Sequence, residues 1–184
     1  RGLAAAVRRL IDATIRSETG TSTLTSATAK VESATKQLSA ALMPGSFGMR
    51  TASDDQGVVA GNVVIGERNP IALPLEVHHE SDGSVWAEFI LGAAYEGPPG
   101  HVHGGVCAMI LDHVLGAPAH QPGRPAYTGT LTLRYVRGTP LNWPLRAEAR
   151  VARVEGRKVF TSGQIAGVSG PTVTAEGVFI LRSG

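Results

Sequence analysis

The sequence predicts an α+β fold in which a curved antiparallel β-sheet wraps around one long central α-helix, preceded by an N-terminal helical extension. Residues 102–115 carry apolar side chains at helical spacing, after a hairpin pattern that ends near residue 91. Alternating segments separated by Gly, Pro or Asn turns follow the helix, at 127–137, 145–155, 158–168 and 172–182. One helix cannot supply a crossover between each pair of parallel strands, so the sheet must be antiparallel.

The first fifty residues are expected to form two helices. A helix over 2–18 is predicted by apolar residues three and four positions apart, which are Leu3, Val7, Leu10, Ile11 and Ile15. A thinner stripe predicts a second helix over 23–42, and its members are Val31, Ala34, Leu38 and Leu42. We expect residues 1–50 to form an extension that packs on a neighbouring segment or a partner chain, and residues 51–184 to form the sheet domain.

The segments 57–65 and 71–91 are rich in alternating and β-branched residues, which predicts strands, with a hairpin turn at Ser81-Asp82-Gly83. Gly97-Pro98-Pro99-Gly100 then breaks the chain before the central helix. A curved sheet around one helix leaves open edges, and pairing between subunits can close them. A homodimer or a dimer of dimers is therefore expected.

Composition excludes several classes of protein. With 42% hydrophobic and 17% charged residues, the chain is expected to be soluble and globular, and its net charge of +2 is too small to suggest nucleic acid. No apolar run approaches the roughly 18 residues that span a bilayer, so no membrane partner is expected. The single cysteine, Cys107, suits a reducing compartment, and a cytoplasmic location is predicted. Arginines among Ser and Thr in the first 44 residues faintly resemble a transit peptide, but Asp12, Glu18 and Glu32 count against one.

The most informative stretch runs from Gly97-Pro98-Pro99-Gly100 through His101-Val102-His103-Gly104-Gly105 to Ile110-Leu111-Asp112. Together with Asn69-Pro70 and Gly156-Arg157-Lys158, it resembles the phenylacetate-degradation-type (PaaI-like) acyl-CoA thioesterases of the hotdog superfamily, over residues 69–182. The resemblance implies a hotdog fold and an enzyme that hydrolyses a fatty or aromatic acyl-CoA to free acid and CoA. It implies no cofactor.

Thioester cleavage places negative charge on the carbonyl oxygen, and the first amides of a helix can stabilise that charge. Gly104 and Gly105 are the predicted oxyanion donors, although paired glycines can also serve only a tight turn. Asp112 is the predicted nucleophile or general base; a purely structural acid there would need a polar partner. Because Gly104 and Asp112 lie about 12 Å apart along one helix, each site would combine residues of two subunits if both roles hold.

Four further roles follow. The resemblance implies that Thr128 positions the water or the acid, although Thr is also an ordinary strand residue. His103 is expected to fix the turn or to hydrogen-bond near the thioester. The phosphates of CoA call for cations, and Arg134, Arg157 and Lys158 fit that need. Asn69, at the start of the resemblance, is assigned to substrate binding.

Other hypotheses are weaker. His101-Val102-His103 resembles part of a cupin metal site, but no Glu follows at the required spacing, so no metal is expected. Cys107 is predicted to be a packing residue rather than a nucleophile. A non-catalytic acyl-CoA sensor or carrier is the main alternative function, and it would have no use for a buried acid such as Asp112. A hotdog hydratase fits less well, because adjacent Asp112 and His113 point about 100° apart on a helix.

Overall fold

The computed structural model describes residues 2–43, 60–73, 75–120 and 123–182. The chain divides into two compact units, one of residues 1–62 with 66–70 and the other of residues 63–65 with 71–184. The boundary predicted at residue 50 lies outside the described residues, so the predicted domain limits stay a prediction.

The first unit contains two helices, α1 (Gly2–Arg16) and α2 (Thr21–Ser39), which confirms the two helices expected there. Helix α1 is amphipathic and buries Ala4, and its Arg8 guanidinium donates a hydrogen bond to the Asn69 carbonyl at 3.4 Å. Helix α2 is different, because none of its residues is buried. Its apolar residues therefore face solvent in the single chain.

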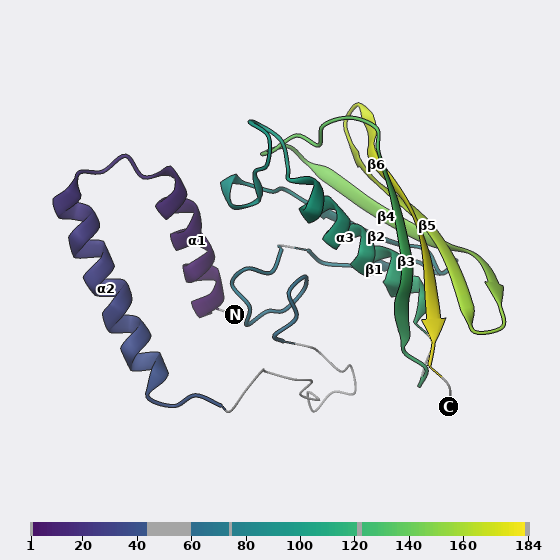
Figure 1. Ribbon diagram of the computed structural model, residues 1–184, viewed down its shortest axis with the longest axis horizontal. Helices are drawn as coiled ribbons and strands as arrows, with labels where there is room; N and C mark the ends of the chain where they lie inside the picture. Colours follow the sequence, from purple (N-terminus) through teal and green to yellow (C-terminus); the bar gives the residue numbers. More distant parts are fainter. Residues whose placement is uncertain (1, 44–59, 74, 121–122, 183–184) are drawn as a thin grey trace. The chain divides into compact units, whose positions relative to one another are not determined.

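The second unit is a six-stranded antiparallel sheet with strand order β1-β2-β4-β5-β6-β3, curved around one helix (Figure 1). The first hairpin pairs β1 (His78–His79) with β2 (Val85–Phe89) across the predicted turn. The later strands are β3 (Ala126–Tyr135), β4 (Leu145–Glu155), β5 (Lys158–Gly167) and β6 (Gly170–Leu181). They confirm the four alternating segments and the predicted α+β fold.

The strand predictions for the residues before β1 were wrong. Residues 60–65 and 71–73 form turns and irregular structure, whereas 57–59 lie outside the described residues. Local hydrogen bonds take up the backbone there, because Gly66 N donates to the Asn62 carbonyl and Arg68 N to the Ala60 carbonyl, at 3.0 and 2.9 Å. No strand among the described residues pairs with this alternating sequence, so nothing there holds it extended.

The central helix α3 (Gly104–Gly116) packs against the inner face of the sheet. Its buried side chains include Ile110, Leu111, Val114 and Leu115. Along β2, Val85, Ala87 and Phe89 are buried and alternate with outward residues, as expected for a sheet with one covered face. The short 3-10 helices η1 (Ala93–Tyr95) and η2 (Ala117–Ala119) flank α3 in the sequence.

Strand β3 lies at one edge of the sheet and contains a bulge. Its pairing with β6 shifts register between Thr128 and Thr130, with Gly129 between them. Leu131 and Leu133 are partly buried against the core, so they point to the inner side of the strand. Regular alternation would place Thr128 on the opposite side, but the extra residue in the bulge turns Thr128 to the inner side as well. Among the described strands β3 pairs only with β6, which leaves its second edge open.

Candidate active site

The N-terminus of α3 presents one backbone donor. His103 is the N-cap, and its Nδ1 accepts a hydrogen bond from Gly105 N at 3.0 Å. Its carbonyl accepts from Val106 N and Cys107 N, at 2.9 and 3.2 Å. Gly104 N has no acceptor among the described residues. Because the His103 carbonyl is doubly hydrogen-bonded and Gly104 N lies at the positive end of the helix, this N–H is a polarised donor.

The turn before α3 is fixed by hydrogen bonds of its own. Glu96 Oε1 accepts from Gly100 N at 2.7 Å, and His103 N donates to the Tyr95 carbonyl at 2.9 Å. Gly100 has φ 74°, which favours glycine, and a Cβ on Gly97 would lie 2.7 Å from the His103 Cα. These contacts hold the helix start in place before a substrate arrives.

Sequence reasoning missed Tyr135, at the end of β3. Its hydroxyl donates to the Gly104 carbonyl at 3.0 Å. Its ring lies 3.3 Å from the position that a Cβ on residue 104 would occupy. Tyr135 therefore ties the helix start to the edge strand. No signal in the sequence connects two residues 31 positions apart in this way.

The other end of α3 carries the acid. Asp112 is partly buried, and Thr128 Oγ1 donates to its Oδ1 at 2.8 Å. Oδ2 has no hydrogen-bond partner among the described residues. The bulge at Gly129 makes the Thr128 contact possible, and an isolated glycine inside a strand pattern was the available signal for it. The bond provides the polar partner that a structural acid would need, and the same bond would hold a reactive carboxylate in one orientation.

His113 follows Asp112 and is partly buried. Burial lowers the pKa of His113 below its ordinary value of 6.5, the Asp112 carboxylate opposes that shift, and nearby His120 adds to it. The imidazole is therefore neutral at pH 7. It contributes no positive charge beside the acid.

The lowered pKa of His113 predicts a pH dependence of stability. The unfolded chain binds this proton more readily than the folded chain, so stability should fall as the pH drops through 6.5. We expect His113→Gln to reduce the change in the free energy of unfolding with pH by up to about 1.4 kcal/mol per pH unit. Denaturant unfolding between pH 7.5 and 5.5 measures it. His79→Gln, at an exposed position, is the control, and an unchanged slope in His113→Gln would contradict the assignment.

Of the predicted phosphate-binding cations, two lie near the Asp112 end. Arg157 and Lys158 are exposed at the β4–β5 turn, and Lys158 pairs with Ile180, which pairs in turn with Tyr127. Two strand spacings separate Lys158 from Tyr127, roughly 10 Å. Arg134 is exposed near the other end of β3, on the side away from Leu133 and Tyr135. Asn69 belongs to the first unit, where its side chain donates to the Gly61 carbonyl at 3.3 Å.

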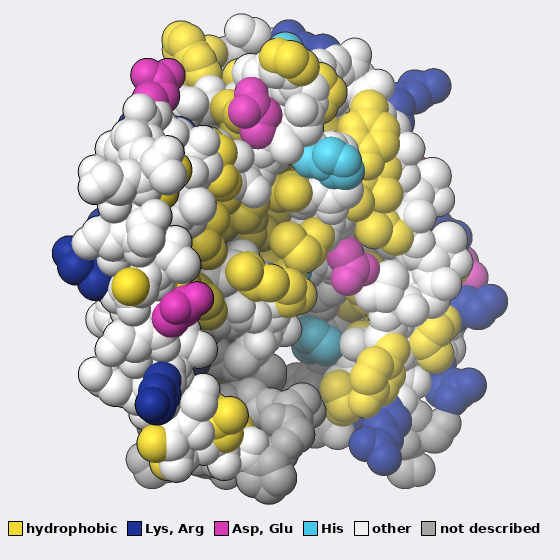
Figure 2. Space-filling view, turned by 60° about the vertical axis from the view of Figure 1, so that its left-hand side comes forward, with side chains coloured by type: hydrophobic (Ala, Val, Ile, Leu, Met, Phe, Trp, Pro, Cys, Tyr) yellow, Lys and Arg dark blue, Asp and Glu magenta, His cyan; other side chains and the backbone are white. Residues whose placement is uncertain are grey.

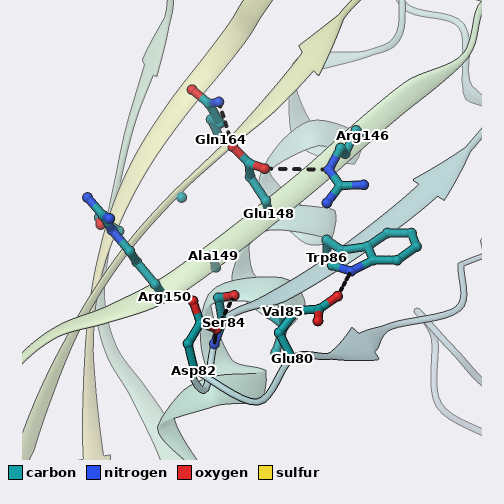
Figure 3. A pocket seen from close by; sticks show the side chains of 12 residues that line it. Glu80, Asp82, Ser84, Val85, Trp86, Arg146, Glu148, Ala149, Arg150 and Gln164 are labelled. Carbon is teal, nitrogen blue, oxygen red and sulfur yellow. Dashed lines mark hydrogen bonds and ion pairs between the residues drawn. The ribbon is translucent and has the colours of Figure 1, made fainter.

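A groove of about 630 Å³ crosses the outer face of the sheet but does not resemble a coenzyme site. Figure 3 shows its lining, which mixes Arg146 and Arg150 with the carboxylates of Glu80, Asp82 and Glu148. These acids would repel phosphates.

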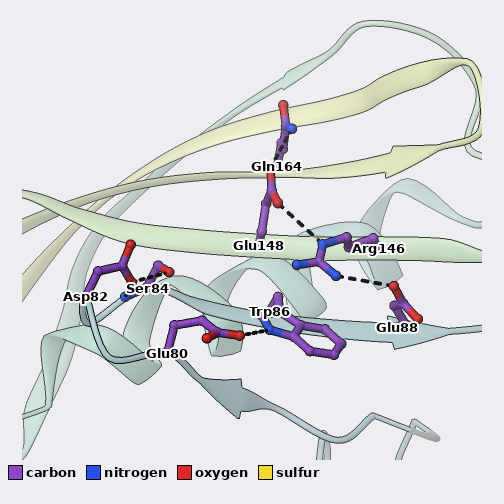
Figure 4. Close-up of polar contacts among 8 residues, drawn as sticks. All are labelled: Glu80, Asp82, Ser84, Trp86, Glu88, Arg146, Glu148 and Gln164. Atoms are coloured by element: carbon purple, nitrogen blue, oxygen red, sulfur yellow. Dashed lines mark hydrogen bonds and ion pairs between the residues drawn. The ribbon is translucent and has the colours of Figure 1, made fainter.

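The groove's polar side chains already bind one another (Figure 4). Arg146 contacts Glu88 and Glu148 at 3.2 and 3.5 Å, and Trp86 Nε1 donates to Glu80 at 2.6 Å. The Arg146 guanidinium also lies 4.3 Å from the centre of the Trp86 ring. These contacts give Arg146 two carboxylate partners and the Trp86 N–H an acceptor, as is typical of a solvated sheet face.

Other candidate sites find little support. The described residues include no group of three His, Cys, Asp or Glu side chains that could hold a metal ion, and His101 Nδ1 lies 2.9 Å from the Pro99 carbonyl. Cys107 is buried, as predicted, and burial raises the pKa of its thiol. On the face that Figure 2 shows, the Lys and Arg side chains stand apart rather than in one patch. No helix among the described residues is long and apolar enough to cross a membrane.

Comparisons with known proteins agree with the fold and with the resemblance. A family model described as the thioesterase superfamily matches residues 99–173. Acyl-coenzyme A thioesterase THEM4 of Xenopus laevis is 42% identical over 74 residues, which are 40% of this chain and 33% of the relative. The chain thus spans about a third of that relative.

Solved structures extend the comparison to more of the chain. BH2602 of Bacillus halodurans, a structure with CoA, shares the fold at 24% identity and a TM-score of 0.53, over 59% of this chain and 74% of its own. Protein RHA08564, a thioesterase superfamily protein, is 36% identical with a TM-score of 0.86, and the alignment covers 97% of this chain and 89% of that chain. This chain therefore belongs to the thioesterase superfamily.

Proposed function

We propose that the protein is an acyl-CoA thioesterase that hydrolyses a fatty or aromatic acyl-CoA to the free acid and CoA. The observation that carries the proposal is the pair of groups on α3, a polarised N–H at Gly104 that no described residue accepts and a carboxylate held by Thr128 at Asp112. The match to THEM4 supports the same substrate class. A cytoplasmic location remains a prediction.

The chemistry assigns a role to each end of α3. When Asp112 acts as a general base, it takes a proton from water while the hydroxide adds to the thioester carbonyl carbon. The oxyanion that forms is stabilised by Gly104 N–H, and its collapse breaks the C–S bond and releases CoA thiolate, which takes the proton. When Asp112 is the nucleophile, its carboxylate adds to the carbonyl carbon instead, and the C–S bond breaks as CoA thiolate leaves and takes a proton from water. Hydroxide or water then hydrolyses the mixed anhydride, which releases the acid and restores the Asp112 carboxylate. Both routes use the same two groups, the Asp112 carboxylate and the Gly104 N–H.

One chain cannot complete the site. Gly104 and Asp112 lie eight residues apart on α3, about 12 Å, whereas a reacting carbonyl must contact both the oxyanion donor and the attacking group within about 3–3.5 Å. Strand β3 has an open edge and runs from Thr128, beside Asp112, to Tyr135, beside Gly104. Antiparallel pairing of two β3 edges, centred near Leu131, would bring the Asp112 end of one chain alongside the Gly104 end of the other. We therefore propose an active homodimer with two composite sites.

The basic turn at Arg157 and Lys158 is assigned to the CoA phosphates, since it lies at the Asp112 end of the sheet. We expect Arg157→Ala with Lys158→Ala to raise the KM for acyl-CoA at least about 10-fold, because phosphate contacts contribute to binding. The KM for a short thioester that lacks the nucleotide should stay unchanged. Thiol release from both substrates measures this, with Lys36→Ala in α2 as the control. Equal effects on the two substrates would indicate a structural role.

The same assay separates hydrolysis from the alternative of a non-catalytic acyl-CoA-binding protein. A binder should retain acyl-CoA without releasing thiol, whereas a thioesterase should release one thiol for each acid formed. A panel of acyl-CoAs of increasing chain length, with aromatic members, then defines the substrate class. Binding without thiol release across the panel would overturn the proposed activity.

A further inference from the structure

Helix α2 has a repeating pattern that neither the sheet nor the candidate site uses. Large apolar residues recur at intervals of seven, at Leu24, Val31 and Leu38, and an alanine follows the first two by three residues, at Ala27 and Ala34. Seven-residue spacing with a second apolar position three residues on is the pattern of helices that pack side by side. All five residues are exposed in the single chain.

The sequence of α2 also indicates that this helix needs a partner. Nine of its nineteen residues are Ser or Thr, which are weak helix formers, and no side chain caps its N-terminus. Most of the stability of a helix in a protein comes from packing, and α2 buries none of its residues. We call the row formed by Leu24, Ala27, Val31, Ala34 and Leu38 the stripe. Packing of the stripe against another surface would supply the missing stability.

The stripe is complementary to itself in one orientation. When two copies of α2 run antiparallel with Ala27 opposite Leu38, Val31 falls opposite Ala34, so every layer between these residues combines one large and one small side chain. A parallel pair in register would instead place Ala27 against Ala27 and Leu38 against Leu38. Alternating large and small residues across an interface pack without voids, whereas layers of alanine alone leave gaps.

Charge selects the register of the antiparallel pair. Shifting the pair by one repeat, with Ala27 opposite Val31, would place the two Lys30 side chains next to each other at the rim. In the register with Ala27 opposite Leu38, Lys30 of one copy lies near Gln37 of the other, and Thr28 lies near Thr35. Like charges in contact destabilise helix pairs, so the register with Ala27 opposite Leu38 is preferred.

A membrane surface fits the stripe less well. The stripe is narrow and contains two alanines, and the polar residues of α2 include Glu32 as well as Lys30 and Lys36. A helix that lies on a bilayer needs a broad apolar face and basic residues along its border. We propose that α2 packs antiparallel against α2 of a second copy of this chain, with Ala27 opposite Leu38.

Cysteine cross-linking in the full chain tests both orientation and register. Cys107 is buried, so the parent chain should give no cross-link and serves as the background. We expect a mixture of differently tagged Ala27→Cys and Leu38→Cys chains to form the mixed cross-linked dimer on mild oxidation or with a short bismaleimide. Leu38→Cys alone should not cross-link to itself, because the two copies of residue 38 would lie eleven residues apart, about 16 Å. A self cross-link at residue 38 would establish a parallel pair and overturn the proposal.

Three further measurements make the test decisive. A mixture of Ala27→Cys with Val31→Cys reports the shifted register, and a higher yield there would contradict the proposed one. Gln37→Glu should raise the yield of the proposed cross-link at least about 2-fold at low salt by pairing with Lys30, and Gln37→Lys should lower it. No cross-link in any mixture, together with cosedimentation on anionic phospholipid vesicles that Leu38→Asp abolishes, would assign α2 to a lipid surface instead.

Discussion

Replacing Asp112 by Asn should leave a folded chain that binds acyl-CoA but hydrolyses it at least about 100-fold more slowly, as loss of a general base or nucleophile commonly does. Asn is almost the same size as Asp, and its Oδ1 can still accept the Thr128 hydroxyl that now contacts the carboxylate at 2.8 Å. The substitution therefore removes the charge and the basicity while it keeps the packing. Thiol release under saturating substrate gives kcat, and titration with CoA checks that binding persists.

A structural role for Asp112 makes a different prediction. If the carboxylate served only to accept the Thr128 hydroxyl, Asp112→Asn would keep that contact and most of the activity, whereas Thr128→Val would remove the contact and should cost more activity than Asp112→Asn. In the proposed mechanism Thr128 only orients the acid, so Thr128→Val should cost less, and Thr128→Ser should restore the activity because it keeps the hydroxyl. Near-normal turnover in Asp112→Asn would refute the assignment.

The fold was largely predictable because its signals are local. Alternation and turn residues identified β3 to β6, and helical spacing identified α3. The segment before β1 was not predictable in the same way, since its β-branched residues have strand propensity but hydrogen bonds from Gly66 and Arg68 fold it into turns. Whether such a segment is extended depends on the presence of a partner strand, which propensity does not encode.

The candidate site was likewise predictable only where its residues are close together in the sequence. The motif containing Gly104 and Asp112 is contiguous in the sequence, so both residues could be proposed from it. Contacts across the fold could not, because the bonds from Tyr135 to Gly104 and from Thr128 to Asp112 depend on how β3 lies beside α3. The structure also bears on the choice between Gly104 and Gly105 as the proposed oxyanion donor. Gly105 N already donates to His103 Nδ1, so we favour Gly104 N.

The central claim is that each active site combines Asp112 of one chain with Gly104 of its partner. Gly104→Pro removes the donor N–H at the first helical position, where proline is tolerated. The residue before it is compatible, because His103 has φ −60° and ψ 134°, as a residue before proline requires. Gly104→Ala is the matched control, since it adds a Cβ near Tyr135 but keeps the N–H.

Mixed dimers of Asp112→Asn and Gly104→Pro test this claim most directly. Each variant alone should be nearly inactive, with losses of at least about 100-fold, whereas Gly104→Ala should retain most of its activity. In a mixed dimer one site regains both intact groups, so activity should return to about half of wild type per mixed dimer, or about a quarter in a randomly exchanged equal mixture. The measurement is thiol release before and after subunit exchange, with exchange verified by differently tagged chains. Recovery to that level supports the shared site, and complete absence of recovery after verified exchange would show that both groups act within a single chain.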